Sequence, residues 1–400
     1  MTAGSQRTGQ ARWGANEIAK SPGAAFWRIW AILLAALLSF DLVAADGAAP
    51  GHELFSETAI RHFRIVLADS ELEKLRRDHN TYVRSTVTVG DQEFRDAGVR
   101  LKGRGSFRPL EDKPSFALKF NEFTAGQRFC GLTKILLNNS SQDRSYLSEY
   151  LCTSLYRDAG VPAARVTFAR VDLNGRELGI YVLIEAMNKV FLRQHFRNPN
   201  GPLYEAYAQD INSSRKLEQD SGPPSDQSDL RALVAAASAP VGERMAALRE
   251  TLDVDRFASF LTVGMLIAQH DSYALNRNNY RLYREPDSSQ FVMIAHGIDG
   301  SFTQNIMPIV PPPKYLLAKA LLEIPEGQQL YRERMANLFT NVFKLEVMTN
   351  RLRFASERLY TAAENDEERA NITRRTTNFI HRVVERYTNV VQQLNSIGVQ

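Results

Sequence analysis

The segment HDSYALNRNNYRLY (residues 270–283) places an Asp beside a His and then sets three Asn in front of an alternating apolar run. The preceding stretch, DVDRFASFLTVGMLIAQ, is apolar on most faces behind a capping Asp253, so it predicts a buried helix. The runs NYRLY and FVMIA, separated by the turn-rich residues 284–290, predict an antiparallel hairpin. A carboxylate and three amides between a buried helix and a buried hairpin indicate a functional loop.

The register of this hairpin brings polar side chains together at one end. If Tyr283 pairs near Phe291, Asp299 lies opposite about residue 275, close to Asn276. Asp271, Asn276 and Asp299 would then converge. Their carboxylate and amide oxygens are hard ligands that suit Mg²⁺ or Mn²⁺ shared with a phosphate.

Two alternatives use the same part of the chain. Taken singly, these Asp and Asn side chains could cap turns and bond to loop backbone, but their joint position favours a metal site. His270 and His296, together with Asp271 and Asp299, would permit a zinc site, although no HxxxH or HxH spacing supports it.

The first half of the chain is predicted to be a sheet with one packed helix. From His62 to Phe120 the pattern is mostly period two with Gly-bearing turns, which predicts antiparallel strands. The segment DRSYLSEYLCTSLYRDAG predicts a helix with leucines on one face and an end at Gly160. Asn174-Gly175 then joins two alternating strands and is a strong hairpin signal.

The second half changes to helical periodicity. The polar stretch INSSRKLEQDSGPPSDQSDL is predicted to be a surface insertion, and the chain from Lys314 onward is predicted to be nearly all helix. The fold class is therefore α+β, with a β-rich N-lobe over residues 59–186 and a helical C-lobe over residues 187–400. The C-lobe would contain the polar hairpin, residues 270–302.

The N-terminal leader predicts export. Arg28 precedes a short apolar run, residues 29–40, which is closed by small residues that a signal peptidase accepts. We expect a signal peptide over residues 1–45, either cleaved or kept as a signal anchor, and a linker over residues 46–58. An exported context would allow Cys130 and Cys152 to form a disulfide; the alternative is two buried free thiols.

The net charge of the chain gives no support to a nucleic-acid partner. The formal net charge is +4, and the leader holds four basic and two acidic residues, so the rest of the chain carries +2. Nucleic-acid binding gains no support from that balance. Contact with a membrane is expected only through an uncleaved signal anchor.

Four segments together resemble the CotH kinase family. They are VRLKGRGS with KPSFALKF, GVPAARVTFARVDLNGRELGIYVLIEAM, NRNNYRLY with FVMIAHGIDGSF, and NFIHRVVERY, and they occur in the expected order over most of residues 60–395. The resemblance implies a bilobal protein-kinase-like fold and phosphoryl transfer from ATP with Mg²⁺ or Mn²⁺.

The resemblance also assigns roles around the hairpin. Asp271 would be the catalytic residue that accepts the proton of a substrate hydroxyl, and Asp299 would hold the metal. Asn276 has the kinase-like spacing, whereas Asn279 matches the Asn-Tyr of the family, so both remain candidate metal ligands. This chain has Gly297 where relatives usually carry the first acid of a Trp-Asp-x-Asp stretch.

The N-lobe supplies the candidate nucleotide contacts. The loop LKGRGS could wrap phosphates through its backbone and through Lys102, Arg104 and Ser106. Lys119 is the predicted phosphate-contacting lysine, with Lys113 as its competitor and Glu149 as its partner by analogy with kinases. Residues 183–186, which include Glu185, would link the lobes and read an adenine edge.

The leading functional hypothesis is an exported Ser/Thr protein kinase that uses ATP and acts on protein hydroxyls. A catalytically weak family member that serves as an envelope or surface binding protein is the alternative, and Gly297 favours it. A metal-dependent phosphohydrolase built on the same carboxylates is a third hypothesis.

Overall fold

The computed structural model describes residues 48–212 and 215–396, so the predicted signal peptide lies outside the described residues. The chain divides into two compact units, Met1–Ala49 and Pro50–Gln400, and the second contains every helix and strand considered below. Within the described residues, no helix is both long enough and apolar enough to cross a membrane.

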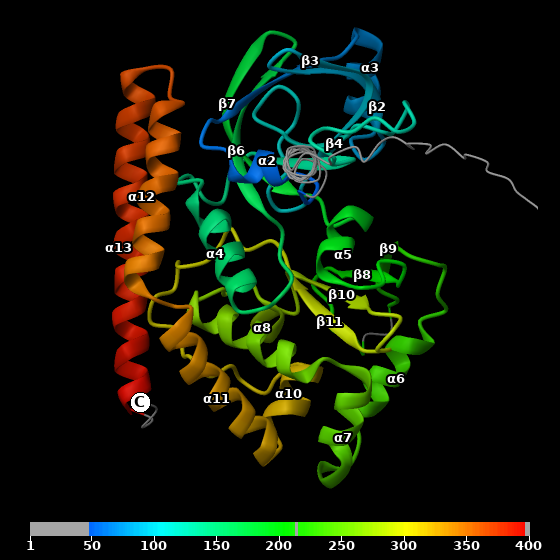
Figure 1. Cartoon of the computed structure of the whole chain (residues 1–400), viewed down its shortest axis with the longest axis vertical. Helices are drawn as coiled ribbons and strands as arrows, with labels where there is room; N and C mark the ends of the chain where they lie inside the picture. The colour runs from blue at the N-terminus through cyan, green and yellow to red at the C-terminus, as the bar shows by residue number, and fades with distance from the viewer. Residues whose placement is uncertain (1–47, 213–214, 397–400) are drawn as a thin grey trace, which may run out of the picture. The chain divides into compact units, whose positions relative to one another are not determined.

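Seven strands of the second unit close into a barrel (Figure 1). All neighbouring strands are antiparallel except β1 and β6, whose parallel pairing closes the barrel. The order is β1-β2-β3-β4-β5-β7-β6, with bounds β1 Arg61–Val66, β2 Val83–Val89, β3 Gln92–Lys102, β4 Ser115–Lys119, β5 Lys134–Asn138, β6 Val166–Leu173 and β7 Arg176–Glu185.

The turn between β6 and β7 confirms the hairpin predicted from Asn174-Gly175. Both residues have positive φ, 49° and 78°, and Leu173 pairs directly with Arg176 across the turn. Asn and Gly tolerate this left-handed conformation best, which is why the pair marks a two-residue hairpin turn. The Asn174 side chain also bonds the backbone N–H and C=O of Leu67, so the turn is tied to the end of β1.

Two short helices accompany the barrel and were not predicted. The helix α2 (His52–Ser56) occupies the stretch expected to be a linker; it buries Leu54, and Arg61 forms ion pairs with its Glu53 and with Glu57 just beyond its end. The helix α3 (Asp69–Arg77) follows β1 and buries Leu75. The sequence prediction missed α3 because its few apolar residues stand among charged ones, and the whole segment was predicted to be strand.

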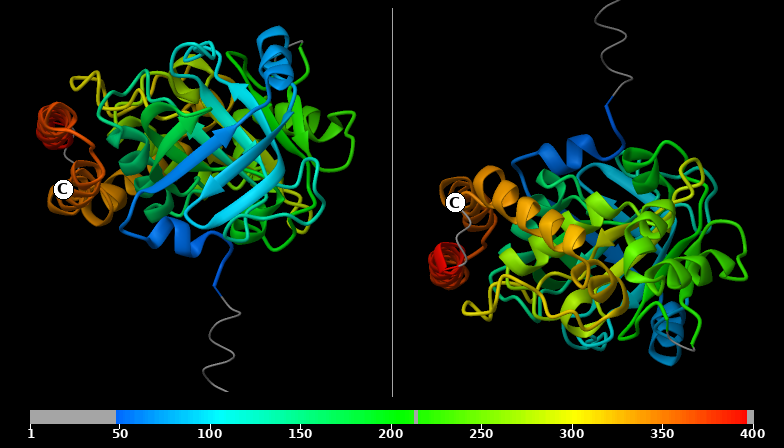
Figure 2. Two further views of the ribbon diagram at one scale, coloured as in Figure 1. Left: turned by 90° about the horizontal axis from the view of Figure 1, so that it is seen from above. Right: turned by 90° about the horizontal axis from the view of Figure 1, so that it is seen from below.

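The helix α4 (Leu147–Asp158) confirms the predicted N-lobe helix and ends just before Gly160, whose φ is +75°. It packs on β6 and also contacts α8 (Val254–Leu266), α12 (Leu345–Thr361) and α13 (Asp366–Ser396). This one helix therefore touches both the barrel and the helical part of the chain. Figure 2 shows α12 and α13 standing as a pair beside the remaining elements in both views.

A second sheet of four strands lies in the helical half. Its order is β11 (Phe291–Ala295), β10 (Tyr280–Arg284), β8 (Leu203–Ala206) and β9 (Glu218–Ser221). The predicted hairpin is present as β10 and β11, with Tyr283 opposite Val292, one residue from the expected partner. The stretch predicted as a surface insertion instead supplies β9 and the first residues of α6 (Ser228–Ala237).

The predicted helix after Asp253 and the helical region after Lys314 are confirmed, whereas α5 (Lys189–His195) and α9 (Tyr273–Asn276) were not predicted. Asp253 caps α8 by accepting a hydrogen bond from Arg256 N, as expected. The region after Lys314 is mostly helical, as predicted. The elements not yet given are α7 Val241–Thr251, α10 Leu316–Leu322 and α11 Pro325–Asn341.

The cysteines are both free thiols. Cys152 is buried in the core formed by α4 and the helical half, whereas Cys130 packs against the separate core inside the barrel. The disulfide considered from the sequence is therefore absent, and the alternative of two free thiols applies.

A buried guanidinium on α13 joins the parts of the helical half. Arg386 has no solvent exposure and donates to the carbonyl oxygens of Met265 and Leu266, at the C-terminal end of α8. It also donates to the carbonyls of Asn305 and Met307, in the segment that follows β11. Burial lowers the pKa of Arg386 to about 10, and no acidic side chain among the described residues pairs with it.

We expect Arg386→Met to lower the free energy of unfolding by about 3 to 5 kcal/mol, because four backbone carbonyls lose a charged donor at once, although Met265 and Met307 keep a bond from Ala268 N and Gln393. The matched control is Arg374→Met on the same helix, where the arginine is exposed and, among the described residues, bonds only Asn371. Chemical denaturation of both variants checks this. Equal, small losses would show that the Arg386 contacts contribute little.

Candidate active site

The carboxylate of Asp271 is held on one side only. Its Oδ2 accepts hydrogen bonds from Asn278 Nδ2 at 2.8 Å and from Asn279 Nδ2 at 2.9 Å. Asn279 Nδ2 also donates to the backbone oxygen of Asp271 at 2.8 Å. No described residue donates to Oδ1. The carboxylate is thus oriented through one oxygen, and the other is left to meet a ligand.

The two asparagines retained as metal ligands have different surroundings. Asn276 ends α9, is exposed, and donates through Nδ2 to the carbonyl of His270 at 3.0 Å. Asn279 is partly buried and turned toward Asp271, with a φ of +55°. The hairpin register thus brings Asn279, and not Asn276, against the Asp271 carboxylate.

Asp299 lies in the loop that follows β11, and α4 holds this loop. Ser148 on α4 donates to the carbonyl of Ile298 at 3.1 Å, and Ser301 donates to the same oxygen at 3.0 Å. Burial raises the pKa of Asp299; the positive charge of Lys102 opposes this shift and the negative charge of Asp143 adds to it. The Asp299 carboxylate accepts no hydrogen bond from another described residue.

Lys102, at the end of β3, is linked to Glu149 of α4 through Asn138. Lys102 Nζ is 3.4 Å from Asn138 Oδ1, and Asn138 Nδ2 donates to Glu149 Oε2 at 3.2 Å. Burial raises the pKa of Glu149 to about 7; the charge of Asp299 adds to the shift and Lys102 opposes it. Burial lowers the pKa of Lys102, against the charges of Glu149 and Asp299. Lys102, Glu149 and Asp299 therefore form one electrostatic cluster.

The predicted pairing of Lys119 with Glu149 is wrong. Lys119 forms an ion pair with Glu122 at 2.5 Å, and its side chain is 39% exposed. Pairing of β3 with β4 explains the difference: Lys102 lies opposite Ser115, whereas Lys119 lies four residues further along β4. At about 3.3 Å per residue, Lys119 is displaced by roughly 13 Å along the strand.

The competitor, Lys113, also lies away from Glu149. Its Nζ donates to the carbonyl of Ile180 at 2.7 Å and sits over the rings of Tyr146 and Tyr181. Burial lowers its pKa to about 8. Lys113 is thus bonded to the barrel wall. Asn138, which links Lys102 to Glu149, was not predicted, because a lone Asn at a strand end carries no recognisable signal.

The glycine-bearing loop after Lys102 is fixed by its neighbours. Gly103 has a φ of +109° and lies close to Ser106 and the backbone of Phe107. Asn139 Nδ2 donates to the carbonyl of Ser106. Arg104 is exposed, stacks on Tyr207 at 4.2 Å and approaches Glu218 of β9 at 3.4 Å. The loop therefore extends from Lys102 toward the second sheet.

Glu185 is bonded within the protein, contrary to a nucleotide-contacting role for its side chain. Its carboxylate accepts hydrogen bonds from Arg165 and Gln194, and it is 1% exposed. Leu183 and Ile184 are each paired with strands on both sides, β5 and β6. Because the barrel already uses these strand residues, residues 183–185 are poorly placed to read an adenine edge.

The zinc alternative finds no support in the histidine contacts. His270 Nδ1 lies 3.2 Å from Thr303 Oγ1, whereas His296 Nε2 lies 3.5 Å from Glu205 Oε1. Among the described residues, the one group of three ligating side chains within reach of one ion is His62, Asp172 and Glu177, on β1, β6 and β7.

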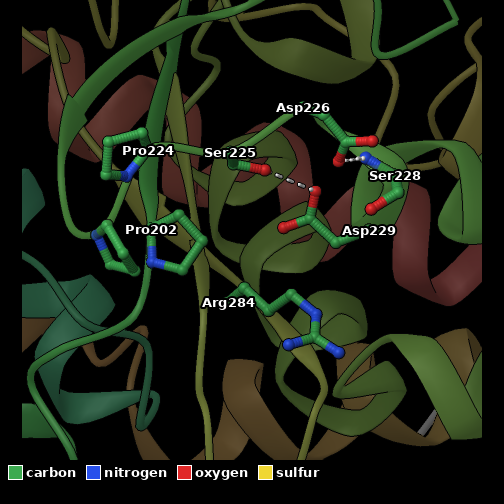
Figure 3. Close-up of a pocket in the computed structure, with 8 residues that line it drawn as sticks. Pro202, Pro224, Ser225, Asp226, Ser228, Asp229 and Arg284 are labelled. Carbon is green, nitrogen blue, oxygen red and sulfur yellow. Dashed lines mark hydrogen bonds between the residues drawn. The ribbon is translucent and has the colours of Figure 1, made fainter.

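A surface pocket also lies apart from the candidate site. Its lining residues come from the segment before β8, the segment leading into α6, and the end of β10; as Figure 3 shows, they include prolines, two acids and Arg284. None of the predicted site residues lines this pocket.

Comparisons with known proteins agree with the resemblance in the sequence. A family model described as CotH kinase protein matches residues 99–397. Inner spore coat protein H of Bacillus subtilis (strain 168) is 21% identical over 321 residues, which cover 74% of this chain and 86% of that protein.

Two solved structures are similar at low identity. The proinflammatory kinase CtkA of Helicobacter pylori is 8% identical, with a TM-score of 0.34 over 73% of this chain and 96% of that chain. The toxin–antitoxin system HipA, HipB and operator DNA complex of Shewanella oneidensis MR-1 gives 14% identity and a TM-score of 0.28, over 88% of this chain and 76% of that chain. Because the family model covers most of the sequence, the chain belongs to the CotH kinase protein family.

Proposed function

We propose that this protein is an exported atypical Ser/Thr protein kinase that transfers the γ-phosphate of ATP to protein hydroxyls. In this proposal the barrel is the N-lobe and the helical half is the C-lobe of a bilobal kinase-like fold. The observation that carries the proposal is that Asn138 bonds both Lys102 and Glu149, while the charge of Asp299 acts on both of them. Membership of the CotH kinase protein family supports it.

The cluster fits a nucleotide bound with a divalent metal. Asp299 offers a carboxylate that no other described residue bonds, and the charges of Glu149 and Asp143 make the electrostatic potential there negative. A dication would offset this repulsion, and the ammonium of Lys102 would bind phosphate oxygens while Glu149 and Asn138 orient it. When bound, Mg-ATP or Mn-ATP supplies the transferable phosphoryl group and the charge that neutralises it.

Asp271 would act on the acceptor. Its Oδ2 is held by two asparagine amides, so Oδ1 is the oxygen that can accept the hydroxyl proton. As that proton moves to Oδ1, the hydroxyl oxygen forms a bond to the γ-phosphorus and the bond to the β,γ-bridging oxygen breaks, releasing ADP. Asp271 thus has the geometry of a base oriented by neighbours that do not themselves react.

A catalytically weak binding protein is the second candidate function. Gly297 favours it, because this position lacks the acid that the family pattern shows before Asp299, and an added acid would strengthen metal binding. Under this alternative the protein would bind a partner at the cell envelope without turnover. The two experiments on the site below separate this alternative from the kinase, and they also identify a phosphohydrolase.

Export is the part of the proposal that rests on the leader. The apolar run of residues 29–40 and the small residues after it are typical of a signal peptide. A curated relative is named as a spore coat protein, which is consistent with a place outside the cytoplasm.

We expect the mature protein recovered from the envelope to begin near Asp46 by mass spectrometry. An intact Met1 in the cytoplasmic fraction would contradict export.

We expect Asp299→Ala to abolish the metal-dependent part of ATP binding, and Lys102→Met to raise the Kd for Mg-ATP about tenfold or more, because a charged hydrogen bond is worth about 1.5 to 3 kcal/mol. Asp172→Ala and Lys119→Met are the matched controls and should leave the Kd within about twofold. Calorimetric titration with and without Mg²⁺ measures all four variants. If instead the Asp172 variant loses metal dependence, the metal binds at the barrel group and not at Asp299.

We expect Asp271→Asn to reduce phosphoryl transfer by about 10²- to 10⁴-fold while the Kd for Mg-ATP stays nearly unchanged, because the base is lost and the metal ligand is kept. The assay follows labelled phosphate on a casein-like acceptor and free phosphate in parallel.

The parent protein also discriminates the alternatives in this assay. Release of free phosphate at the same rate with and without acceptor identifies a phosphohydrolase, and no turnover of either kind identifies a binding protein. Equal transfer by the parent and Asp271→Asn would show that Asp271 is not the base.

A further inference from the structure

Gly297 occupies a position that a side chain could not share with Asn279. Its φ is +61°, and a Cβ added there would lie 2.3 Å from Asn279 Oδ1 and 2.9 Å from Asn279 Cγ. Contacts this short require one group to move. Glycine at 297 is therefore a condition for the observed position of the Asn279 side chain.

The other end of the same amide holds Asp271. Asn279 Nδ2 donates both to the Oδ2 carboxylate oxygen and to the backbone oxygen of Asp271, so it fixes the side chain relative to its own main chain. An amide is planar and rigid, and moving Oδ1 away from residue 297 must also move Nδ2. Displacement at residue 297 would therefore be transmitted to the Asp271 carboxylate.

We propose that Gly297 and Asn279 form a positioning pair for Asp271. Gly297 leaves the space in which the Asn279 amide can lie, and that amide keeps Oδ2 of Asp271 engaged so that Oδ1 faces the acceptor hydroxyl. The inference rests on the proposed kinase function. It also gives the departure at residue 297 a physical meaning: the glycine preserves the orientation of the base where an acid would displace Asn279.

Asn278 provides an internal comparison. It donates to the same Oδ2 of Asp271, but its own amide oxygen accepts a hydrogen bond from Ala208 N at 3.4 Å. The three atoms nearest to a Cβ built at residue 297 all belong to Asn279, and none belongs to Asn278. Asp271 therefore keeps one donor when Asn279 is disturbed, and the expected effect is misorientation of the carboxylate with the protein still folded.

The first measurement uses Gly297→Ala with Gly90→Ala as its matched control. Gly90 has a φ of +58°, nearly that of Gly297, but an added Cβ there meets nothing within 4 Å, so this variant carries the backbone strain alone. We expect Gly297→Ala to lower kcat about 10²-fold, the cost of a misplacement near 1 Å, with the KM for Mg-ATP changed by no more than about twofold. Gly90→Ala should leave kcat unchanged.

The second measurement is a double-mutant cycle on kcat. Asn279→Ala removes the amide that the new Cβ would strike, so adding Gly297→Ala to it should cause no more than about a twofold further loss. In an Asp271→Asn background, neither substitution should lower the residual kcat further, because both act through that carboxylate. Independent, multiplicative losses in either cycle would overturn the positioning pair.

The same variants distinguish failure of the pair from failure of the proposed function. If the parent transfers no phosphate, the kinase proposal fails, and the cycle is then measured on the unfolding temperature. If the pair exists, Gly297→Ala lowers the unfolding temperature of the parent more than Gly90→Ala does. In an Asn279→Ala background, Gly297→Ala lowers it no more than Gly90→Ala does. Equal shifts in both backgrounds would refute the contact itself.

Discussion

The buried guanidinium of Arg386 is the interaction on which the arrangement of the candidate site depends. A cation without an acidic partner is costly to bury, and here four backbone carbonyls offset that cost. Two of them, from Met265 and Leu266, belong to the C-terminal end of α8, where the helix dipole favours positive charge. The other two follow the loop that carries Asp299. Arg386 on α13 thus holds the end of α8, which precedes Asp271, and the segment that follows Asp299. The separation of the two carboxylates therefore depends on a side chain outside the site.

The second constraint comes from α4, which connects the barrel to the same loop. Ser148 holds the Ile298 carbonyl, and the next residue, Glu149, faces Lys102 and Asn138. These contacts are polar, whereas the body of α4 is packed by buried apolar side chains. The apolar face therefore places the helix, and the polar contacts at its first turn select which end of the barrel meets Asp299. A shift of one residue in the register of β3 would turn Lys102 to the other face of the strand and remove it from this cluster.

Local signals made much of this architecture predictable. The Asn174-Gly175 turn, the leucine face of α4, the capped apolar helix α8 and the alternation of β10 and β11 each follow from a few neighbouring residues. Closure of the barrel through parallel pairing of β1 and β6 joins segments about a hundred residues apart, and no local pattern encodes it. The assignment of Lys119 as the partner of Glu149 failed for a related reason: it used spacing along the chain, whereas the pairing of β3 with β4 decides the position. The orientation of Asn279 was likewise not predictable, because it depends on space left by a glycine in another loop.

The electrostatics of the cluster bear on the missing acid at residue 297. Glu149 and Asp299 place two carboxylates near the ammonium of Lys102, and Asp143 adds negative charge near both; the pKa of Glu149 rises to about 7 through burial and the charge of Asp299. Burial alone would raise the pKa of Glu205, but His296 and Arg281 hold that pKa well below the usual range. Glu205 therefore adds a further negative charge that acts on Lys102. Another acid at residue 297 would increase this repulsion before any metal arrives. With glycine there, fewer protein charges attract a free dication, and phosphate oxygens would have to complete its ligands. Under the proposed kinase function, metal and nucleotide would therefore enter the site together.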